Sequence, residues 1–306
     1  MTSRRKTVLA IGAFDGVHVG HQAILAHARQ VAKRYDVPCT AVTFDRHPIS
    51  VVRPSPEPIL LSTLTDRLAL LIHYGADMVA TLRFDERLAS LSAESFVREV
   101  LVDRLHAGAV VIGKDFRFGH RRRGDLEMLQ SLGVTLGFAV HPVPDVLYKA
   151  GRISSTRIRQ ALTTGDLAEA TGLLGRIHYL CGRVVKGRQL GRTIGYPTAN
   201  LQPDPMLLIP NSGIYAGWFL THDGAVSWPA AVSIGYRPTV RGRKITIEAH
   251  LPGYNGDLYG RDARLGLIHR IRDEQQFPSL DALRHQISDD VHQCMDLLSG
   301  ATPKAG

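Results

Sequence analysis

One turn determines the fold of the first half of the chain: Gly12-Ala13-Phe14-Asp15-Gly16-Val17-His18-Val19-Gly20-His21. It follows the apolar residues 8–11, which predict a strand. Glycines let backbone N–H groups approach an anion closely, and a helix starting near Gly20 would direct its positive N-terminal end to the same point. His18 and His21, three residues apart, can face one ligand and donate to phosphate oxygens. The turn therefore predicts a phosphate-binding site between a strand and a helix.

Two other interpretations of this turn are weaker. The histidines could be solvated side chains of an ordinary strand-to-helix turn, but the six fixed residues of F-D-G-x-H-x-G-H argue against that. A zinc site is the second alternative. The stretch lacks the cysteine or carboxylate partners that a tetrahedral zinc site would need nearby.

The first half alternates short apolar runs with helical patterns, which is typical of a parallel sheet flanked by helices. The predicted strands are 8–11, 39–44, 77–82, 109–112 and 136–140. The predicted helices are 21–35, 64–74 and 93–106, the last with Ser92 as N-cap and Gly108 just beyond its end. This order predicts a doubly wound, Rossmann-like nucleotide-binding domain, in which ligands lie beyond the carboxyl ends of the strands.

The pattern changes after Gly175. Two more helices are expected before it, 157–163 with Ser154 or Ser155 as cap, and 166–174. Beyond it, strands at 180–186, 213–219, 230–234, 244–250 and 264–271 predict a small antiparallel β-barrel. We therefore expect two domains, residues 1–175 and 176–306.

A terminal helix is expected after the barrel, with Ser279 as its N-cap. One face of it carries an apolar stripe, which we interpret as core packing rather than a partner site: Leu280, Leu283, Ile287, Val291, Cys294 and Leu298.

Composition narrows the classes of partner. The 306 residues carry a formal net charge of +9, which suits nucleic acid, an anionic membrane or polyphosphate substrates. The basic residues are spread along the chain without a nucleic-acid-binding motif, and no stretch approaches the ~20 apolar residues of a membrane helix. Three scattered cysteines indicate neither a disulfide framework nor a metal knuckle. We expect a cytoplasmic protein without nucleic-acid or membrane partners, as a monomer or transient homo-oligomer.

The turn resembles the H-x-G-H signature of nucleotidyltransferases. Residues 111–119 and 152–159 resemble the G-x-D-F-x-F-G and I-S-S-T-x-I-R segments of the prokaryotic bifunctional riboflavin kinase/FAD synthetase family. The second half resembles that family in G-x-P-T-A-N at 195–200, in Glu248 and in 256–260, so the match runs from about residue 8 to 298. A class I aminoacyl-tRNA synthetase shares H-x-G-H, but I-S-S-T-R-I-R occupies the place of its lysine-rich loop.

In the first half, the resemblance implies transfer of AMP from ATP to FMN, with His18 and His21 as catalytic contacts to the phosphates. It implies a set of ATP- and phosphate-binding residues: Gly12, Phe14, Asp15, Gly16, Gly20, Arg152, Ser155, Thr156 and Arg159. It also implies an FMN pocket formed by Asp115, Phe116, Arg117 and Phe118. Two alternatives stay open: residues 154–156 can serve as ordinary N-caps, and the two phenylalanines can be core residues on one side of an edge strand. Residues 121–123 are most simply a solvated basic loop.

In the second half, the resemblance implies riboflavin phosphorylation with Mg²⁺ as cofactor. Glu248 would be the base for the riboflavin 5′-hydroxyl, and Thr198 and Asn200 would hold the metal. Gly187, Gly191, Gly195 and Pro197 would bind ATP. The chain departs from the family pattern at Arg46, Leu190, Tyr236 and residues 252–254, and the last three predict an altered flavin pocket.

The sequence thus predicts an enzyme that phosphorylates riboflavin to FMN and adenylylates FMN to FAD, with ATP as the second substrate of both reactions. A paralogue that keeps one of these activities, or that acts on a modified flavin, is the alternative. A nucleic-acid-binding protein is the third interpretation, and it rests on net charge alone.

Overall fold

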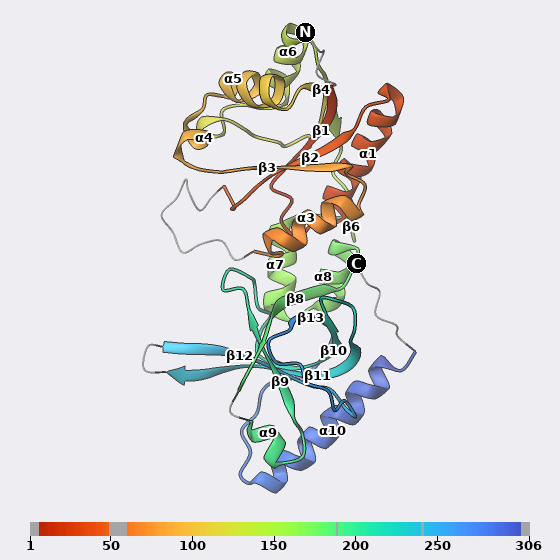
Figure 1. The fold of residues 1–306 in the computed structure, drawn as a ribbon, viewed down its shortest axis with the longest axis vertical. Coiled ribbons are helices and arrows are strands. Elements are labelled where there is room, and N and C mark those ends of the chain that lie inside the picture. The colour runs from red at the N-terminus through yellow and green to blue at the C-terminus, as the bar shows by residue number, and fades with distance from the viewer. Residues whose placement is uncertain (1–5, 49–59, 188, 240–241, 301–306) are drawn as a thin grey trace. The chain divides into compact units, whose positions relative to one another are not determined.

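The computed structural model describes residues 6–48, 60–187, 189–239 and 242–300 (Figure 1). The chain divides into two compact units, Met1–Ser155 and Thr156–Gly306. Each unit has its own sheet, and each is described by itself below.

The first unit is built on a parallel sheet of five strands in the order β3-β2-β1-β4-β5. Residues alternate between the two faces of β1: Val8 and Ala10 pack into one core cluster, and Leu9 and Ile11 into the other. Both faces of the sheet are therefore covered, as expected for parallel strands that read as continuous apolar runs. The strands are β1 Thr7–Ile11, β2 Cys39–Phe44, β3 Met78–Leu82, β4 Ala107–Gly113 and β5 Ala139–Val143.

Helices cover the two faces of this sheet. Leu25 of α1 and Leu71 of α3 belong to the first core cluster, whereas Val97 of η1 and Leu129 of α6 belong to the second. This arrangement confirms the doubly wound α/β architecture. The helices are α1 Val19–Tyr35, α3 Leu64–His73, α4 Glu86–Ser90, α5 Ala93–Ser95, the π-helix η1 Phe96–Arg104, the 3₁₀ helix η2 His120–Arg122, and α6 Leu126–Leu136; a hairpin of β6 Leu147–Tyr148 and β7 Gly151–Arg152 follows.

The second unit is a closed barrel in the order β10-β11-β12-β9-β8-β13, which confirms the predicted antiparallel barrel. Its strands are β8 His178–Val185, β9 Thr198–Pro203, β10 Gly213–Thr221, β11 Ser227–Thr239, β12 Gly242–His250 and β13 Asp262–Arg272. The helices are α7 Ser155–Thr164, α8 Leu167–Leu174, α9 Leu190–Thr193 and α10 Leu280–Leu298. Helix α8 packs against β8 and β13 and ends at Gly175 in the left-handed conformation. The predicted domain boundary after Gly175 stays a prediction.

Helix α10 lies along the barrel in Figure 1, and a buried ion pair fastens it there. The Arg272 guanidinium donates from Nε to Asp290 Oδ1 at 2.7 Å and from Nη2 to Oδ2 at 2.6 Å. Cys294 and Leu298 pack against Ala216 of β10, so the C-terminal half of the apolar stripe is core. Its first member is not, because the Leu280 side chain is 67% exposed.

Several predicted elements differ from the structure. Helix α6 was not predicted, and the strand expected at 136–140 lies at Ala139–Val143, because Leu136 ends α6 and Gly137 reverses the chain with φ 76°. The helix expected at 93–106 is a short α-helix followed by the π-helix η1. Gly108 lies inside β4, and His106 instead takes the left-handed conformation at φ 52°.

Candidate active sites

The turn after β1 is strained. Phe14, Gly16 and Val17 have φ values of 51°, 77° and 38°, the left-handed region that side-chain-bearing residues avoid. Phe14 and Val17 are fully buried, and a β-branched residue such as valine is especially rare there. Strain of this kind persists only where the surroundings determine the backbone, and it concentrates at functional sites.

Neighbouring segments hold the turn through Asp15 and Gly16. The Asp15 carboxylate accepts from the Leu61 amide at 2.9 Å, and the Gly16 amide donates to Ser62 Oγ at 3.1 Å. The Ser155 hydroxyl donates to the Asp15 carbonyl at 3.1 Å. Asp15, predicted as phosphate-binding, therefore has a carboxylate that shapes the turn.

His18 and His21 lie together at the start of α1. His18 is the N-cap: its Nδ1 accepts from the His21 amide at 3.2 Å. The two imidazole rings stack with centroids 3.6 Å apart, and the Phe14 ring meets His21 edge-on at 5.2 Å. A Cβ on Gly20 would lie 3.2 Å from the His18 ring, so this glycine makes room for the stack. The predicted histidine pair is thus brought together at a helix N-terminus.

Helix α7 begins at Ser155, two residues before the predicted start at 157. Thr156 is exposed and Arg159 is half-buried on the same helix. Both belong to the second compact unit, and their contribution to a pyrophosphate site stays a prediction.

The predicted FMN residues follow β4 in a loop. Phe118 is 5% exposed and belongs to the second core cluster, and Phe116 stacks on it with ring centroids 5.7 Å apart. The alternative interpretation is correct that both rings pack in the core, because Phe116 also packs against the second core cluster. Its edge strand is wrong, because β4 ends at Gly113 and lies between β1 and β5. Phe116 is the more exposed of the two rings, and its contact with a flavin stays a prediction.

Ion pairs hold the charged residues of this loop. Arg117 Nη1 lies 2.9 Å from Asp125 Oδ2. Arg152, predicted as phosphate-binding, pairs with Asp115 and lies 3.2 Å from Asp145 Oδ1. Arg152 thus links the predicted FMN loop to the segment leading into α7. Residues 121–123 are exposed, as expected for a solvated basic loop.

The predicted kinase residues meet across two barrel strands. In the antiparallel pairing of β12 with β9, Glu248 lies opposite Asn200 and His250 opposite Thr198. The Thr198 hydroxyl donates to Glu248 Oε2 at 3.1 Å. The three residues expected to hold the metal and the base are therefore neighbours. Strand β9 itself was not predicted, although it carries two of them.

Glycines shape the segment that precedes β9. A Cβ on Gly187 would collide with the Asn200 side chain, and one on Gly191 would collide with the Tyr196 carbonyl. Gly195 has φ 90°, and among the described residues none beyond its chain neighbours comes within 4 Å of its Cβ position. The three predicted glycines therefore allow close approach or a backbone conformation that other residues avoid.

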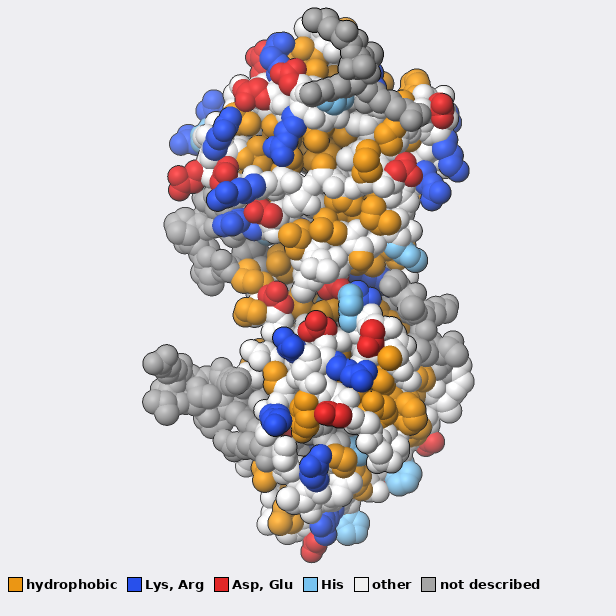
Figure 2. Space-filling model, in the orientation of Figure 1, with side chains coloured by type: hydrophobic (Ala, Val, Ile, Leu, Met, Phe, Trp, Pro, Cys, Tyr) orange, Lys and Arg blue, Asp and Glu red, His pale blue; other side chains and the backbone are white. Residues whose placement is uncertain are grey.

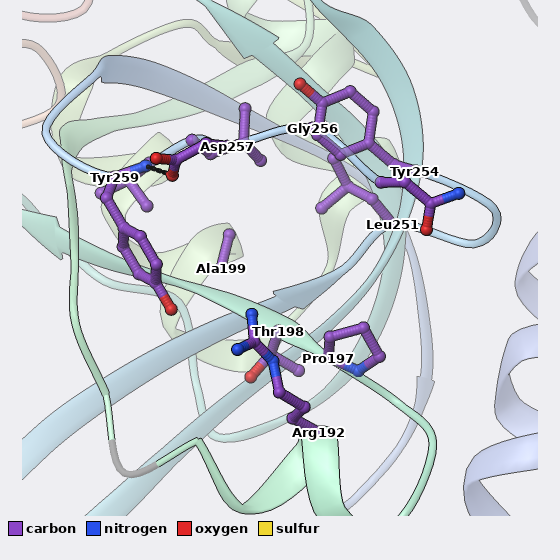
Figure 3. A pocket seen from close by; sticks show the side chains of 12 residues that line it. Arg192, Pro197, Thr198, Ala199, Leu251, Tyr254, Gly256, Asp257 and Tyr259 are labelled. Carbon is purple, nitrogen blue, oxygen red and sulfur yellow. Dashed lines mark hydrogen bonds between the residues drawn. The ribbon is translucent and has the colours of Figure 1, made fainter.

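A cavity of about 320 Å³ opens beside this segment (Figure 3). Pro197, Thr198 and Arg192 line it on one side in Figure 3, and Tyr254, Asp257 and Tyr259 belong to the facing loop. Its buried apolar lining includes Leu251 and Leu258, which are 5% and 7% exposed. The cavity is thus lined by buried apolar and exposed polar side chains, as small-molecule sites often are.

The departures from the family pattern fall in different places. Tyr254 lines the cavity, its ring lies 5.5 Å from Trp228, and the Trp228 indole donates to the Pro252 carbonyl at 2.7 Å. Leu190 and Tyr236 are 61% and 43% exposed, and Arg46 is exposed too. Residues 252–254 are therefore the departure that shapes the cavity.

Sequence reasoning missed two residues beside these sites. His250 Nδ1 donates to the Pro197 carbonyl at 2.9 Å, immediately before Thr198, and its ring meets Tyr196 at 5.3 Å. Arg67 of α3 is buried beneath the turn after β1 and donates to the Ala13 carbonyl. The sequence did contain a signal for His250. It lies two residues after Glu248 on a predicted strand, so both side chains are on the same face.

Charge on the surface is mixed. Figure 2 shows basic side chains interspersed with acidic ones over the face in view. Among the residues described, no helix has the length and apolar character to cross a membrane.

Two protein-family models match the chain: FAD synthetase over residues 1–157 and riboflavin kinase over residues 174–298. The bifunctional riboflavin kinase/FMN adenylyltransferase of Escherichia coli (strain K12) is 41% identical over 283 residues, covering 92% of this chain and 90% of the relative. The chain belongs to the bifunctional riboflavin kinase/FMN adenylyltransferase family. The resemblance seen in the motifs is thereby confirmed.

Other members of the family and one solved structure extend this likeness. The Pseudomonas fluorescens member is 42% identical over 288 residues, covering 94% of this chain and 91% of the relative. A crystal structure from Streptococcus pneumoniae, which carries the name macrolide-efflux protein, matches with a TM-score of 0.88 and 31% identity over 97% of this chain and 96% of the other. The family fold therefore extends over nearly the whole chain.

Proposed function

We propose that the chain phosphorylates riboflavin to FMN in its barrel unit and transfers AMP from ATP to FMN in its first unit. Both family models support this, and so do the names of the relatives. The observation that carries it is that each unit contains one predicted phosphate-transfer site with its polar groups together. These are the stacked His18 and His21 in the first unit, and Thr198 beside Glu248 in the second.

In adenylyl transfer, a phosphate oxygen of FMN attacks the α-phosphorus of ATP, and pyrophosphate leaves. In the turn after β1, the Gly12 and Gly16 amides donate to Val42 and Ser62, so the Phe14 amide between them would meet the phosphates. The N-terminal end of α1 would favour the same anion. His18 and His21 would donate to the phosphates and stabilise the charge that develops on the leaving group. Ser155, the last residue of the first unit, would bind the pyrophosphate end, and Phe116 would contact the flavin ring.

In riboflavin phosphorylation, the oxygen of the riboflavin 5′-hydroxyl attacks the γ-phosphorus of ATP, and ADP leaves. Glu248 would take the proton of that hydroxyl. The Thr198 hydroxyl orients the carboxylate by donating to Oε2. The cavity lined by Leu251, Tyr254 and Pro197 would hold the adenosine of ATP, with Arg192 at the rim beside the phosphates.

Thr198 and Asn200 fit a magnesium ion, because their hydroxyl and amide oxygens are hard donors. Asn200 lies opposite Glu248, and Thr198, two residues away on the same strand, donates to the Glu248 carboxylate. The absence of a side chain at Gly187 leaves room beside Asn200. Bound there with ATP, Mg²⁺ would neutralise charge on the β- and γ-phosphates.

A cytoplasmic location and a monomeric or transiently oligomeric state belong to the same proposal. All three cysteines are free thiols, which supports a reducing compartment.

Incubation of the purified chain with riboflavin, ATP and Mg²⁺, followed by chromatography, tests the proposed function. We expect FMN to appear first and FAD to follow, and we expect FAD from supplied FMN. Production of FMN alone, or of FAD only from supplied FMN, would instead establish the single-activity alternative. No product from either flavin would refute both.

A further inference from the structure

Arg67 has the largest fully buried side chain among the described residues, with 1% of its surface exposed. It projects from α3, whose other buried residues, Leu70 and Leu71, are apolar. Burying a guanidinium is unfavourable unless specific partners compensate for lost hydration. Packing of α3 alone does not explain a buried arginine here, because an apolar side chain would fill the same position without the cost of burying a charge.

Two buried donors from different elements converge on one carbonyl of the strained turn. Arg67 Nη1 donates to the Ala13 carbonyl at 2.9 Å, and Thr43 Oγ1 of β2 donates to the same oxygen at 3.1 Å. Thr43 is fully buried. Burial lowers the pKa of Arg67, and the nearby carboxylates of Asp15 and Asp45 oppose that effect.

The direction of this carbonyl fixes the direction of the next amide. In a planar trans peptide the C=O and the N–H point in opposite directions. Because the Ala13 carbonyl points inward to Arg67 and Thr43, the Phe14 N–H points outward from them. No residue in the described part of the chain accepts a hydrogen bond from that amide. Phe14 then enters the left-handed region at φ 51°, and the histidine pair follows.

We infer that Arg67 is a positioning residue for adenylyl transfer. It holds the Ala13–Phe14 peptide so that the Phe14 amide faces the ATP phosphates, and its buried charge favours the same polyanion. The inference rests on the proposed function of this turn and adds to it a residue outside every motif of the family resemblance. Arg67 does not touch the reacting atoms itself.

The test uses the full chain with paired substitutions. Arg67→Met keeps the length of the side chain and removes its charge and donors, whereas Arg67→Lys keeps a cation and one donor. Leu71→Met, at a fully buried position of the same helix, controls for altered packing of α3. Initial rates of FAD formation are measured with ATP and FMN varied separately. Riboflavin phosphorylation is measured in the same preparation, because it uses the other unit.

We expect Arg67→Met to lower kcat/KM for ATP in FAD formation by about 10- to 100-fold, because small misplacements of catalytic contacts have effects of this size. KM for FMN and the rate of riboflavin phosphorylation should stay within about twofold. Arg67→Lys should recover most of the loss, since a cation and a donor return, and Leu71→Met should match the wild type.

Unchanged FAD kinetics in Arg67→Met would overturn the inference, as would a loss that Arg67→Lys does not relieve. If Arg67→Met fails to fold, Thr43→Val decides, because it removes the second donor to the same carbonyl without touching a buried charge. A lower kcat/KM for ATP in Thr43→Val supports the inference, and unchanged kinetics contradict it. His21→Ala separates this from the proposed function, since retained FAD formation there would refute the site itself.

Discussion

The two phosphate-transfer sites are built in opposite ways. In the first unit, the turn after β1 is buried and strained, and residues from β2, α3 and the segment before α3 hold it through hydrogen bonds. In the barrel, the cavity beside β9 has exposed residues at its rim, such as Arg192 and Tyr259. Glycines rather than buried donors shape the segment that leads into it.

This difference shows two ways to bind one cosubstrate. A turn held by the core is preorganised, so little ordering remains to be done when the phosphates bind. A glycine-bounded segment with few buried contacts is easier to order or open locally, so its binding free energy includes that ordering. We therefore expect the first site to depend on residues remote from the ligand, such as Arg67, and the second on residues along its own strands.

Reciprocal loss of activity is the largest effect expected from this separation. His21→Ala should lower FAD formation by ~10²-fold or more while riboflavin phosphorylation persists, because a charge-stabilising contact is removed. Glu248→Gln should do the opposite, since the base is lost and the amide keeps its shape. Chromatography of products from riboflavin and from FMN measures both. Parallel loss of the two activities in either variant would contradict the separation of the sites.

The boundary between the units can be located by comparing two fragments. The first fragment, residues 156–306, is the second compact unit and keeps α7 and α8 with the barrel. The second fragment, residues 176–306, begins at the boundary predicted from the sequence and lacks both helices. Loss of α8 removes the buried Leu167, Leu173 and Leu174, so we expect the shorter fragment to be less stable by on the order of 4 kcal/mol. Urea unfolding measures this. Equal midpoints would place α8 outside the folding unit of the barrel.

Acid should weaken the barrel selectively through His178 at the start of β8. Burial, together with the charge of Arg176, lowers the pKa of this 3%-exposed histidine from 6.5 to about 4. Because the folded pKa is depressed, stability is full above pH 6.5 and falls as the pH drops toward 4, by about 3 kcal/mol. Both tryptophans, Trp218 and Trp228, lie in the barrel, so their fluorescence reports its unfolding.

His178→Leu is the matched variant for this effect. It should flatten the dependence of the barrel's unfolding free energy between pH 6.5 and 4, whatever its stability at pH 7. An unchanged slope would show that His178 is not the responsible group.

His250 tests how strongly the barrel site depends on its own strands. His250→Leu should lower riboflavin phosphorylation by about 10-fold, because it releases the Pro197 carbonyl next to Thr198. His250→Asn should retain most of the rate, since its amide nitrogen can replace Nδ1 as donor, whereas His250→Gln places the amide farther out and should not. FAD formation from FMN is the control. Equal rates in the Asn and Gln variants would refute the hydrogen-bond explanation.

Sequence patterns predicted the elements whose periodicity is strong. The runs 8–11 and 39–44 are continuous and apolar, and they became central strands at nearly the predicted bounds. Helix α6 was not predicted, because Gly133 weakens its helical pattern. The apolar residues that follow Gly133 suggested a strand starting at Leu136 instead. Strand β9 was not predicted because it follows Pro197, ends at Pro203 and has no continuous apolar run.

The motif residues were predictable because they are close together in sequence, as the stacked histidines are. Pairing of Glu248 with Asn200 depends on barrel register, which no local sequence pattern indicates. Arg67 was not predictable, because a charged residue on an amphipathic helix normally faces solvent, and only the tertiary structure places the turn above it.

The His18 N-cap has a consequence for protons. Since Nδ1 accepts from the His21 amide, the neutral ring carries its hydrogen on Nε2, and that tautomer is the one able to donate to a phosphate. An imidazolium would place a second hydrogen on Nδ1 and break the cap. A proton and the first turn of α1 therefore compete for the same lone pair. The ring therefore caps the helix through Nδ1 and keeps Nε2 as the donor that faces a ligand.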